Sequence, residues 1–340
     1  CLKYNFPVML LNEEVDSQEL KEIINQFKPG YIFTQNFDYS DSTSLQIRSK
    51  AFTAFKQTES IDINPELALL LTTSGSTGKS KFVRISRENL LANTQDIARY
   101  LPTKKDDVSI TSLPIFYTYG LSIVNLCLLT GNSLVVTNKS VIQREFWDAL
   151  DSHKVTSLSG VPYTYSMLNK VKFFKKNHPN LRYLTQAGGR LERDLKEKIS
   201  VYAEKQNIEF FVMYGQTEAT ARISYVPPQQ LKNKIDSIGL PVASGKIEIL
   251  NPDENGVGEL VYKGVNVCLG YATSFMDLDT GDINKGILHT GDIGYLDADG
   301  YGYITGRKSR FVKIFGARVG LDIVESMVER LDEMESKLNE

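Results

Sequence analysis

The sequence predicts an α/β protein with doubly wound, mostly parallel sheets, followed by a β-rich subdomain and a short C-terminal segment. In the first 236 residues, apolar runs typical of buried strands alternate with stretches of helical periodicity, which indicates parallel crossover connections. From Ser237 the pattern changes to short alternating strands between glycine-rich turns. From Arg307 a hairpin pattern precedes an amphipathic stretch with helical spacing. We therefore divide the chain into regions 1–236, 237–306 and 307–340.

Composition limits the classes of function. With 340 residues and 41% hydrophobic content, the chain can form about two domains with a substantial core. The 39 basic residues nearly balance the 41 acidic ones and form no long basic run, so we expect no nucleic-acid partner. The three cysteines lack the spacing of a metal or disulfide framework, which predicts a reduced, cytoplasmic compartment. The most apolar stretch, residues 121–129, is too short to span a membrane.

The first elements are expected to be a strand, a helix and a strand. Residues 8–11 are apolar, and Asp16 or Ser17 can cap a helix whose apolar face recurs at helical spacing up to Phe27. Pro29 and Gly30 then end that helix before a second apolar strand. We expect these three elements to form one parallel crossover unit. The polar residues 37–59 predict an irregular surface connection.

A loop rich in serine, threonine and glycine follows the next strand. Residues 67–71 form an unbroken apolar run, which suits a strand buried on both faces. Glycines in the loop let backbone N–H groups approach an anion, hydroxyls add donors, and Lys79 and Lys81 add positive charge. This chemistry suits phosphate oxygens, and ATP is the first ligand to consider. The loop residues expected to line the phosphates are Thr73, Ser74, Gly75, Ser76, Thr77 and Gly78.

A Walker A loop is the alternative for this segment. That motif needs G-x-x-x-x-G-K-[ST] leading directly into a helix. Gly78, Lys79 and Ser80 fit its second half, but Thr73 occupies the position of the first glycine. Residues 81–86 alternate like a strand, and helical periodicity begins only at Glu88. We therefore expect a loop between two strands, with a P-loop kinase as the weaker hypothesis and an ordinary Ser/Gly-rich turn as the structural alternative.

The remaining elements follow from periodicity and turn residues. Helices are expected at 88–100, near 121–129, at 144–152, from Tyr163 and at 192–205. Strands are expected between them at 108–112, 133–137, 155–159, 182–186 and 209–214. The β-rich part should hold strands at 246–250 and 258–262 and a hairpin at 297–304 around Asp299 and Gly300. Near the end we expect a hairpin from 311 to 319 and a helix over 324–338.

Several motifs together resemble those of the adenylate-forming enzymes, which include acyl-CoA synthetases, peptide-synthetase adenylation domains and luciferases. Residues 73–82 resemble the signature T-S-G-[ST]-T-G-x-P-K-G, although Ser80 and Phe82 replace its Pro and Gly. Residues 214–218 match Y-G-x-T-E. Four further stretches resemble the glycine-rich adenine contact, the T-G-D motif, the Gly-Arg motif and the loop that follows it, at 187–191, 290–292, 306–308 and 315–319. The resemblance covers nearly the whole chain in family order.

The resemblance implies a site for ATP and Mg²⁺. Tyr214 would lie against adenine, Thr217 would contact the α-phosphate region, and Glu218 with Thr73 would hold Mg²⁺, a hard cation that takes oxygen ligands. The ribose would be reached by Asp292 and Arg307. The implied catalytic residues are Lys81, Thr217, Glu218 and Arg307. The nucleotide contacts would include the loop residues 73–78 together with Lys81, Ala187, Gly188, Gly189, Tyr214, Gly215, Gln216, Thr217, Asp292 and Arg307.

Residues 113–120 resemble the L-P-L-F-H-x-x-G stretch that borders the acid pocket in acyl- and aryl-acid ligases. Tyr117 stands where the family usually has His. Peptide-synthetase domains for α-amino acids carry an Asp nearby, whereas no acidic residue lies between 113 and 132 here. An unpaired substrate ammonium would cost several kcal/mol in such a pocket. We therefore expect an organic acid without an amino group, contacting Tyr117, Gly120, Gly188 and Gly215.

The function expected from this resemblance is ATP-dependent activation of a carboxylic acid as an acyl-adenylate, with release of pyrophosphate. The acyl group would then pass to a thiol, either coenzyme A or the phosphopantetheine of an acyl carrier protein. The family's small C-terminal α+β domain follows the Gly-Arg motif, and its catalytic lysine would lie beyond residue 340. We therefore expect residues 307–340 to be the remnant of a truncated domain. A non-catalytic nucleotide-binding module is the rival from another class.

Overall fold

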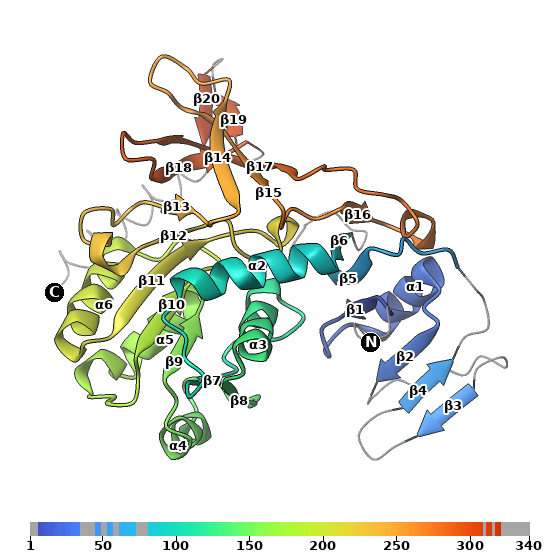
Figure 1. Cartoon of the computed structure of the whole chain (residues 1–340), viewed down its shortest axis with the longest axis horizontal. Coiled ribbons are helices and arrows are strands. Elements are labelled where there is room, and N and C mark those ends of the chain that lie inside the picture. Colours follow the sequence, from blue (N-terminus) through green and yellow to red (C-terminus); the bar gives the residue numbers. More distant parts are fainter. Residues whose placement is uncertain are drawn as a thin grey trace.

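A computed structural model describes residues 6–34, 61–72 and 81–308, together with the backbone of four short strands at 45–48, 53–56, 311–314 and 317–320. The Ser/Gly-rich loop at 73–80 and the helix expected over 324–338 lie outside the described residues. Figure 1 shows a large α/β layer below, a β-rich layer above it, and the N-terminal elements at one side. Within the described residues, no helix combines the length and apolarity needed to cross a membrane.

A seven-stranded sheet forms the centre of the α/β layer. Its strands run in the order β13-β12-β11-β10-β9-β7-β8. The neighbours from β11 to β8 are parallel, and only β12 and β13 join antiparallel, so the predicted mostly parallel sheet is confirmed. The bounds are β7 Val108–Ile110, β8 Ser133–Val135, β9 Ser157–Gly160, β10 Tyr183–Gln186, β11 Glu209–Tyr214, β12 Ser224–Val226 and β13 Leu240–Pro241.

Helices cover both faces of this sheet, as the doubly wound prediction requires. Successive strand residues point to opposite faces, and on β11 Phe210 and Val212 pack with one group of helices while Phe211 and Met213 pack with the other. The first group is α4 (Arg144–Ser152), α5 (Pro162–Lys170) and α6 (Arg193–Gln206), and the second is α2 (Arg87–Tyr100) and α3 (Thr118–Thr130).

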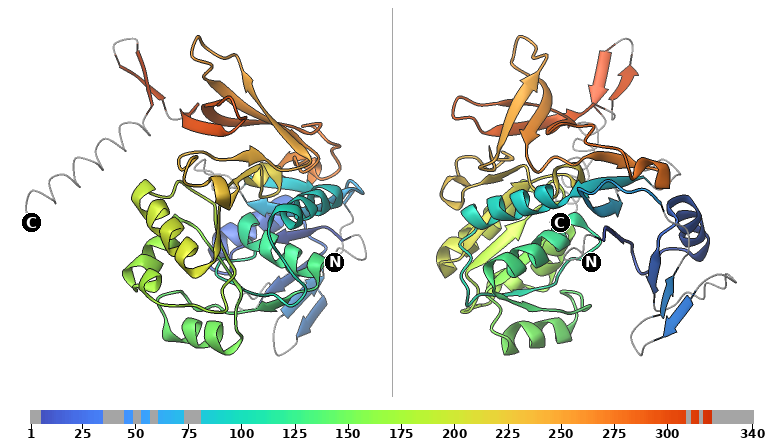
Figure 2. Two further views of the ribbon diagram at one scale, coloured as in Figure 1. Left: turned by 60° about the vertical axis from the view of Figure 1, so that its left-hand side comes forward. Right: turned by 45° about the vertical axis from the view of Figure 1, so that its right-hand side comes forward.

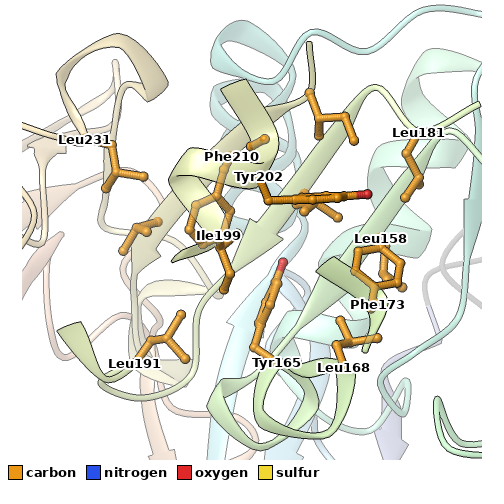
Figure 3. Close-up of a cluster of buried hydrophobic side chains, with 14 of the residues drawn as sticks. Leu158, Tyr165, Leu168, Phe173, Leu181, Leu191, Ile199, Tyr202, Phe210 and Leu231 are labelled. Carbon is orange, nitrogen blue, oxygen red and sulfur yellow. The ribbon is translucent and has the colours of Figure 1, made fainter. Parts of the chain in front are cut away.

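The larger core lies between the sheet and the first group of helices. Figure 3 shows Tyr165, Phe173, Ile199, Tyr202 and Phe210 interlocking there. All of them are at most 6% exposed. Burying one large apolar side chain stabilises the fold by about 1.5–3 kcal/mol, so this cluster anchors the strands whose carboxyl ends carry the candidate site.

The Ser/Gly-rich loop joins two strands of a second sheet. This sheet has the order β1-β5-β6-β16, with bounds Val8–Leu10, Leu67–Thr72, Phe82–Ser86 and Gly270–Ala272. Strands β5 and β6 are antiparallel neighbours, which confirms the predicted loop between strands. A Walker A loop would instead enter a helix. Helix α1 (Ser17–Phe27) packs on this sheet through Ile23 and Phe27.

The predicted parallel crossover in residues 7–34 is wrong. Strand β1 pairs with β5, whereas β2 (Tyr31–Thr34) belongs to a separate antiparallel sheet with β4 (Thr53–Lys56) and β3 (Leu45–Arg48). The predicted irregular connection at 37–59 therefore contains two strands. In β2 only Ile32 is buried, and such a strand suits an antiparallel sheet with one exposed face.

The β-rich layer is an antiparallel sheet of four strands, with order β14-β15-β17-β18. The bounds are β14 Gly245–Leu250, β15 Gly258–Gly264, β17 Ile287–Leu296 and β18 Gly302–Arg307. Figure 2 shows this sheet stacked over α2 and the seven-stranded sheet. The predicted terminal hairpin is present as β19 (Phe311–Ile314) and β20 (Ala317–Gly320). The domain boundaries at 236 and 306 remain predictions, and β13 and β16 connect the second region to sheets of the first.

Candidate functional site

The loop after β11 has a tightly constrained backbone. Gly215 lies so close to the Ala221 carbonyl that a Cβ atom there would collide with its oxygen. Residues Thr217–Ala219 form a single 3₁₀ turn, and Thr220 and Ala221 then take φ angles of 53° and 101°. Such left-handed conformations cost non-glycine residues of order 1–3 kcal/mol each and cluster at functional sites. The surrounding structure must therefore hold this loop.

Buried asparagines supply that support. Asn266 is 0% exposed and donates from Nδ2 to the carbonyls of Ala219 at 2.7 Å and Arg222 at 2.8 Å. Thr220 Oγ1 donates back to the Asn266 carbonyl at 2.8 Å. Asn93 of α2 donates to the Arg222 carbonyl at 3.0 Å. Neither asparagine was singled out from the sequence, because a lone Asn in a helix or turn carries no local signal for a contact so distant along the chain.

Asp292 joins three of the motifs found in the sequence. It is 1% exposed and lies on β17. Its Oδ2 accepts hydrogen bonds from the Tyr214 hydroxyl and from Gln216 Nε2, the latter at 3.0 Å. Its Oδ1 accepts from Arg307 Nε at 2.8 Å. The structure therefore brings together residues from 214–218, 290–292 and 306–308 that were expected to meet at the nucleotide.

The electrostatics of this cluster favour fixed protonation states. Burial, and then the neighbouring Asp292 carboxylate, raise the pKa of the Tyr214 hydroxyl well above its ordinary value. The hydroxyl therefore stays protonated and remains a donor. Gln216 Nε2 also donates to the Thr290 carbonyl at 3.0 Å, which ties the loop to β17. Arg307 is the exposed member, with 56% of its side chain accessible, so it can reach solvent or a ligand.

A second cluster joins Glu218 and Lys81 through a residue that the sequence did not reveal. The Tyr271 hydroxyl donates to Glu218 Oε1 at 2.7 Å. Lys81 Nζ lies 3.3 Å from the centroid of the same ring. Burial and the Glu218 charge raise the pKa of Tyr271, so this hydroxyl also stays protonated. The only sequence signal is a Gly-Tyr pair at 270–271, which by itself predicts no site.

The donor set suits Mg²⁺ held together with a phosphate ligand. Within the described residues, no group of three or more His, Cys, Asp or Glu side chains gathers as a closed metal cage. Mg²⁺ usually takes one or two protein carboxylates and completes its shell with phosphate oxygens and water. Glu218, with one carboxylate oxygen bonded to Tyr271, fits that pattern. Thr73, the other expected ligand, lies outside the described residues, as do the other predicted phosphate contacts at 74–78.

The glycine-rich turn after β10 approaches the expected acid pocket. Gly188 has φ of +80°, and a Cβ atom there would lie against the Tyr117 hydroxyl. Gly189 is exposed, and its carbonyl accepts from Gln186 Nε2 at 2.9 Å. Gly120, in the first turn of α3, packs directly on the Pro114 carbonyl. Of the substrate contacts expected from the sequence, Tyr117 and Gly188 are therefore neighbours in the fold.

A buried arginine gives this region positive charge. Arg222 is 2% exposed, and its guanidinium carbon lies 4.6 Å from the Tyr119 ring centroid. Its Nε donates to the Tyr100 hydroxyl at 3.2 Å. Between α2, α3 and the central sheet, Arg222, Tyr119 and Ser122 line a cavity of about 20 Å³, enough for one water molecule. Arg222 therefore places a positive charge near Tyr117, a residue expected to border the acid pocket.

Comparison with known proteins agrees with the family resemblance of the motifs. The family model described as AMP-binding enzyme matches residues 1–272. A 2-succinylbenzoate–CoA ligase from Oceanobacillus iheyensis is 27% identical over 335 residues, which cover 96% of this chain and 66% of that protein. The match therefore spans slightly less than two thirds of the relative's length.

Solved structures agree on the fold. The O-succinylbenzoate coenzyme A synthetase of Bacillus subtilis in complex with AMP has a TM-score of 0.74 at 24% identity, covering 94% of this chain and 67% of that one. The structure of VinN in complex with L-aspartate has a TM-score of 0.60 at 30% identity, covering 73% of this chain and 62% of that one. The first likeness, at 24% identity, shows a shared fold, and the second is to a protein whose structure holds L-aspartate.

Proposed function

This chain belongs to the family of AMP-binding enzymes, and from that premise we propose that it takes part in ATP-dependent activation of a carboxylic acid. In this reaction a carboxylate oxygen attacks the α-phosphorus of ATP, an acyl–oxygen–phosphorus bond forms, and the bond to pyrophosphate breaks. A thiol then displaces AMP from the acyl-adenylate. The observation that carries the proposal is the convergence of Tyr214, Gln216 and Arg307 on the buried carboxylate of Asp292.

We assign ribose binding to the Asp292 cluster. The carboxylate is held by donors from two sides, so its oxygens are fixed in position before ligand binding. Ribose hydroxyls can replace the exposed Arg307 as donors, and Arg307 can then turn toward the nucleotide. Tyr214, with its hydroxyl anchored, can present its ring to adenine. Fixed positioning of this kind lowers the entropy cost of reaching the transition state.

The phosphate side of the site is assigned to Lys81, Thr217 and Glu218. The acid is already a carboxylate at neutral pH, so the chain does not need a general base to generate the nucleophile. Its task is to hold the triphosphate and the acid in line and to balance the developing negative charge. Lys81 supplies positive charge at the exit of the loop at 73–80. Mg²⁺ bound at Glu218 would neutralise further phosphate charge.

We propose an organic acid without an amino group as the substrate and coenzyme A as the thiol, in the cytoplasm. The 2-succinylbenzoate named for the Oceanobacillus relative is the first acid to test. Arg222 beside Tyr119, and the acid-free segment 113–132, support the choice against ammonium-bearing substrates. Phosphopantetheine on an acyl carrier protein is the alternative acceptor.

Acid-dependent exchange of labelled pyrophosphate into ATP tests the proposal. The panel contains 2-succinylbenzoate, benzoate, short and long aliphatic acids, L-aspartate and the deaminated analogue of each amino acid used. Exchange that requires an acid supports adenylation, and preference for an α-amino acid over its deaminated analogue contradicts the substrate class. ATP binding in calorimetry without exchange for any acid would favour the non-catalytic nucleotide-binding module.

A further inference from the structure

We propose that Tyr271 is a positioning residue of the adenylation site, which fixes Glu218 for metal binding and keeps it apart from Lys81. The proposal rests on the function proposed above for Glu218 and Lys81. It is carried by two contacts of one side chain. The Tyr271 hydroxyl donates to Glu218 Oε1 at 2.7 Å, and Lys81 Nζ lies 3.3 Å from the ring centroid.

The fold places Tyr271 between the two motifs by strand pairing. Strand β16 pairs antiparallel with β6, and Tyr271 faces Val83 while Ala272 faces Phe82. Lys81 directly precedes β6 and therefore lies beside β16. This pairing brings residue 271 to the end of the Ser/Gly-rich loop, although 190 positions separate the two in the chain.

Hydrogen bonds fix the backbone on both sides of Tyr271. The buried Arg84 donates from Nε to the Tyr271 carbonyl at 3.2 Å and from Nη2 to the Leu269 carbonyl at 3.0 Å. Toward the other motif, Cys268 N–H donates to the Glu218 carbonyl at 2.8 Å. The short segment 268–271 is therefore tied at one end to the strand that follows Lys81 and at the other end to the loop of Glu218.

In this arrangement the two oxygens of the Glu218 carboxylate have different roles. Oε1 is engaged by the Tyr271 hydroxyl, which fixes the rotation of the carboxylate and leaves Oε2 to face a metal ion. In the described part of the chain, no ion pair joins Lys81 directly to Glu218, because the ammonium lies over the ring. A direct pair would neutralise the charge that Mg²⁺ needs. Hydrogen bonds to metal-binding carboxylates typically change metal affinity by about 10- to 100-fold.

Two substitutions separate the roles of hydroxyl and ring. Tyr271→Phe keeps the ring under Lys81 but removes the hydroxyl bond to Glu218. Tyr271→Leu removes both contacts. Tyr165→Phe is the matched control, since it removes a tyrosine hydroxyl bond of 2.9 Å to the Thr185 carbonyl in the core shown in Figure 3. Circular dichroism and melting temperature establish that each variant is folded.

The measurement is calorimetric binding of ATP to the chain over a series of Mg²⁺ concentrations, with EDTA as the metal-free arm. For Tyr271→Phe we expect a higher Mg²⁺ requirement: the Mg²⁺ concentration that gives half of the maximal increase in ATP affinity should rise about 10-fold. The ATP affinity in EDTA should stay unchanged within about twofold. For Tyr271→Leu we expect both quantities to worsen, because Lys81 is freed to pair with Glu218. Tyr165→Phe should match the parent in both arms.

The outcomes separate this proposal from the function on which it rests. If the parent protein does not bind ATP, both the proposed function and the role of Tyr271 are overturned. If the parent binds ATP in a Mg²⁺-dependent way and Tyr271→Phe shows the same Mg²⁺ requirement, only the role of Tyr271 is overturned. Lys81→Met tests the same geometry if the Tyr271 variants do not fold. It should weaken ATP binding yet keep the Mg²⁺ requirement within about twofold, since the hydroxyl still fixes Glu218. A rise of about 10-fold there would contradict the separating role of the ring.

Discussion

Arg307 donates from Nε to Asp292 Oδ1 at 2.8 Å across the β17–β18 ladder, where the two residues face each other in register. The other oxygen of the same carboxylate accepts hydrogen bonds from Tyr214 and Gln216, which lie at and just after the end of β11. One buried charge thus ties the antiparallel sheet to the parallel sheet. Because its partners come from two other motifs, 214–218 and 306–308, changes at Asp292 should affect ligand binding and stability together.

Asp292→Asn should lower nucleotide affinity at least about 10-fold and stability by about 1–2 kcal/mol. The amide keeps the shape but cannot accept from all three donors, and Arg307 loses its counter-charge. The stability effect is modest because Arg307 is 56% exposed and screened by solvent. Calorimetry with AMP and urea unfolding measure the two effects. Asp299→Asn, at a side chain 70% exposed in another ion pair, should leave AMP affinity unchanged.

Glu218→Gln should reduce acid-dependent pyrophosphate exchange by about 100-fold, corresponding to the roughly 3 kcal/mol that one electrostatic contact supplies in a transition state. Its melting temperature should fall only slightly, because the amide oxygen can still accept from Tyr271. Exchange rates and melting curves are measured on the same preparations. Exchange within about threefold of the parent would mean that the carboxylate does not hold the metal.

Arg84→Met should destabilise the protein by about 3 kcal/mol or more. Arg84 is 0% exposed and donates to the carbonyls of Leu269, Tyr271, Thr280 and Gly281, which would lose their partners. Arg144→Met is the control, since Arg144 is 90% exposed in a surface pair and should cost at most about 0.5 kcal/mol. Urea unfolding compares the two, and equal effects would show that the buried bonds contribute little.

Tyr202→Phe should raise stability or leave it unchanged, whereas Tyr165→Phe should lower it by about 1 kcal/mol. Tyr202 is 6% exposed, and its hydroxyl has no hydrogen-bond partner in the described part of the chain. Tyr165 lies in the same cluster, but its hydroxyl donates to the Thr185 carbonyl. Denaturant unfolding of both variants tests the contrast. Clear destabilisation by Tyr202→Phe would reveal a bound partner, such as water, at that oxygen.

Alkaline pH should destabilise the parent more than Tyr202→Phe. Burial raises the pKa of Tyr202 from 10.0 to about 12, so folding favours its neutral form. The contribution of neutral Tyr202 to the free energy of unfolding is fully present below pH 10.0, where the tyrosine of the unfolded chain is also neutral. It is lost as the pH rises from 10.0 toward about 12. We expect the free energies of unfolding to diverge by about 2 kcal/mol across this window. If the free energies of unfolding of the parent and of Tyr202→Phe fall in parallel with rising pH, the buried Tyr202 phenol is not the cause of the alkaline destabilisation.

The sequence by itself determined the element types and the family motifs. Apolar runs and period-3.6 stripes report which segments and faces are buried, and this local information located the helices from 87 to 206 and the five parallel strands β7 to β11 within a few residues. The antiparallel strands β12 and β13 of the same sheet were not predicted. The alternation of the two types also predicted a parallel sheet. The resemblance of the motifs to those of the family predicts the roles of residues such as Glu218 and Asp292 without knowledge of their surroundings.

Only the tertiary structure decided which strands pair and which side chains meet. An apolar run shows that a strand is buried but not which partner covers it, so β1 paired with β5 rather than β2. For the same reason the placement of Tyr271 between Lys81 and Glu218 had no local signal. It depends on the pairing of β16 with β6, a contact between segments distant in the chain, whose register is set by the packing of the whole sheet.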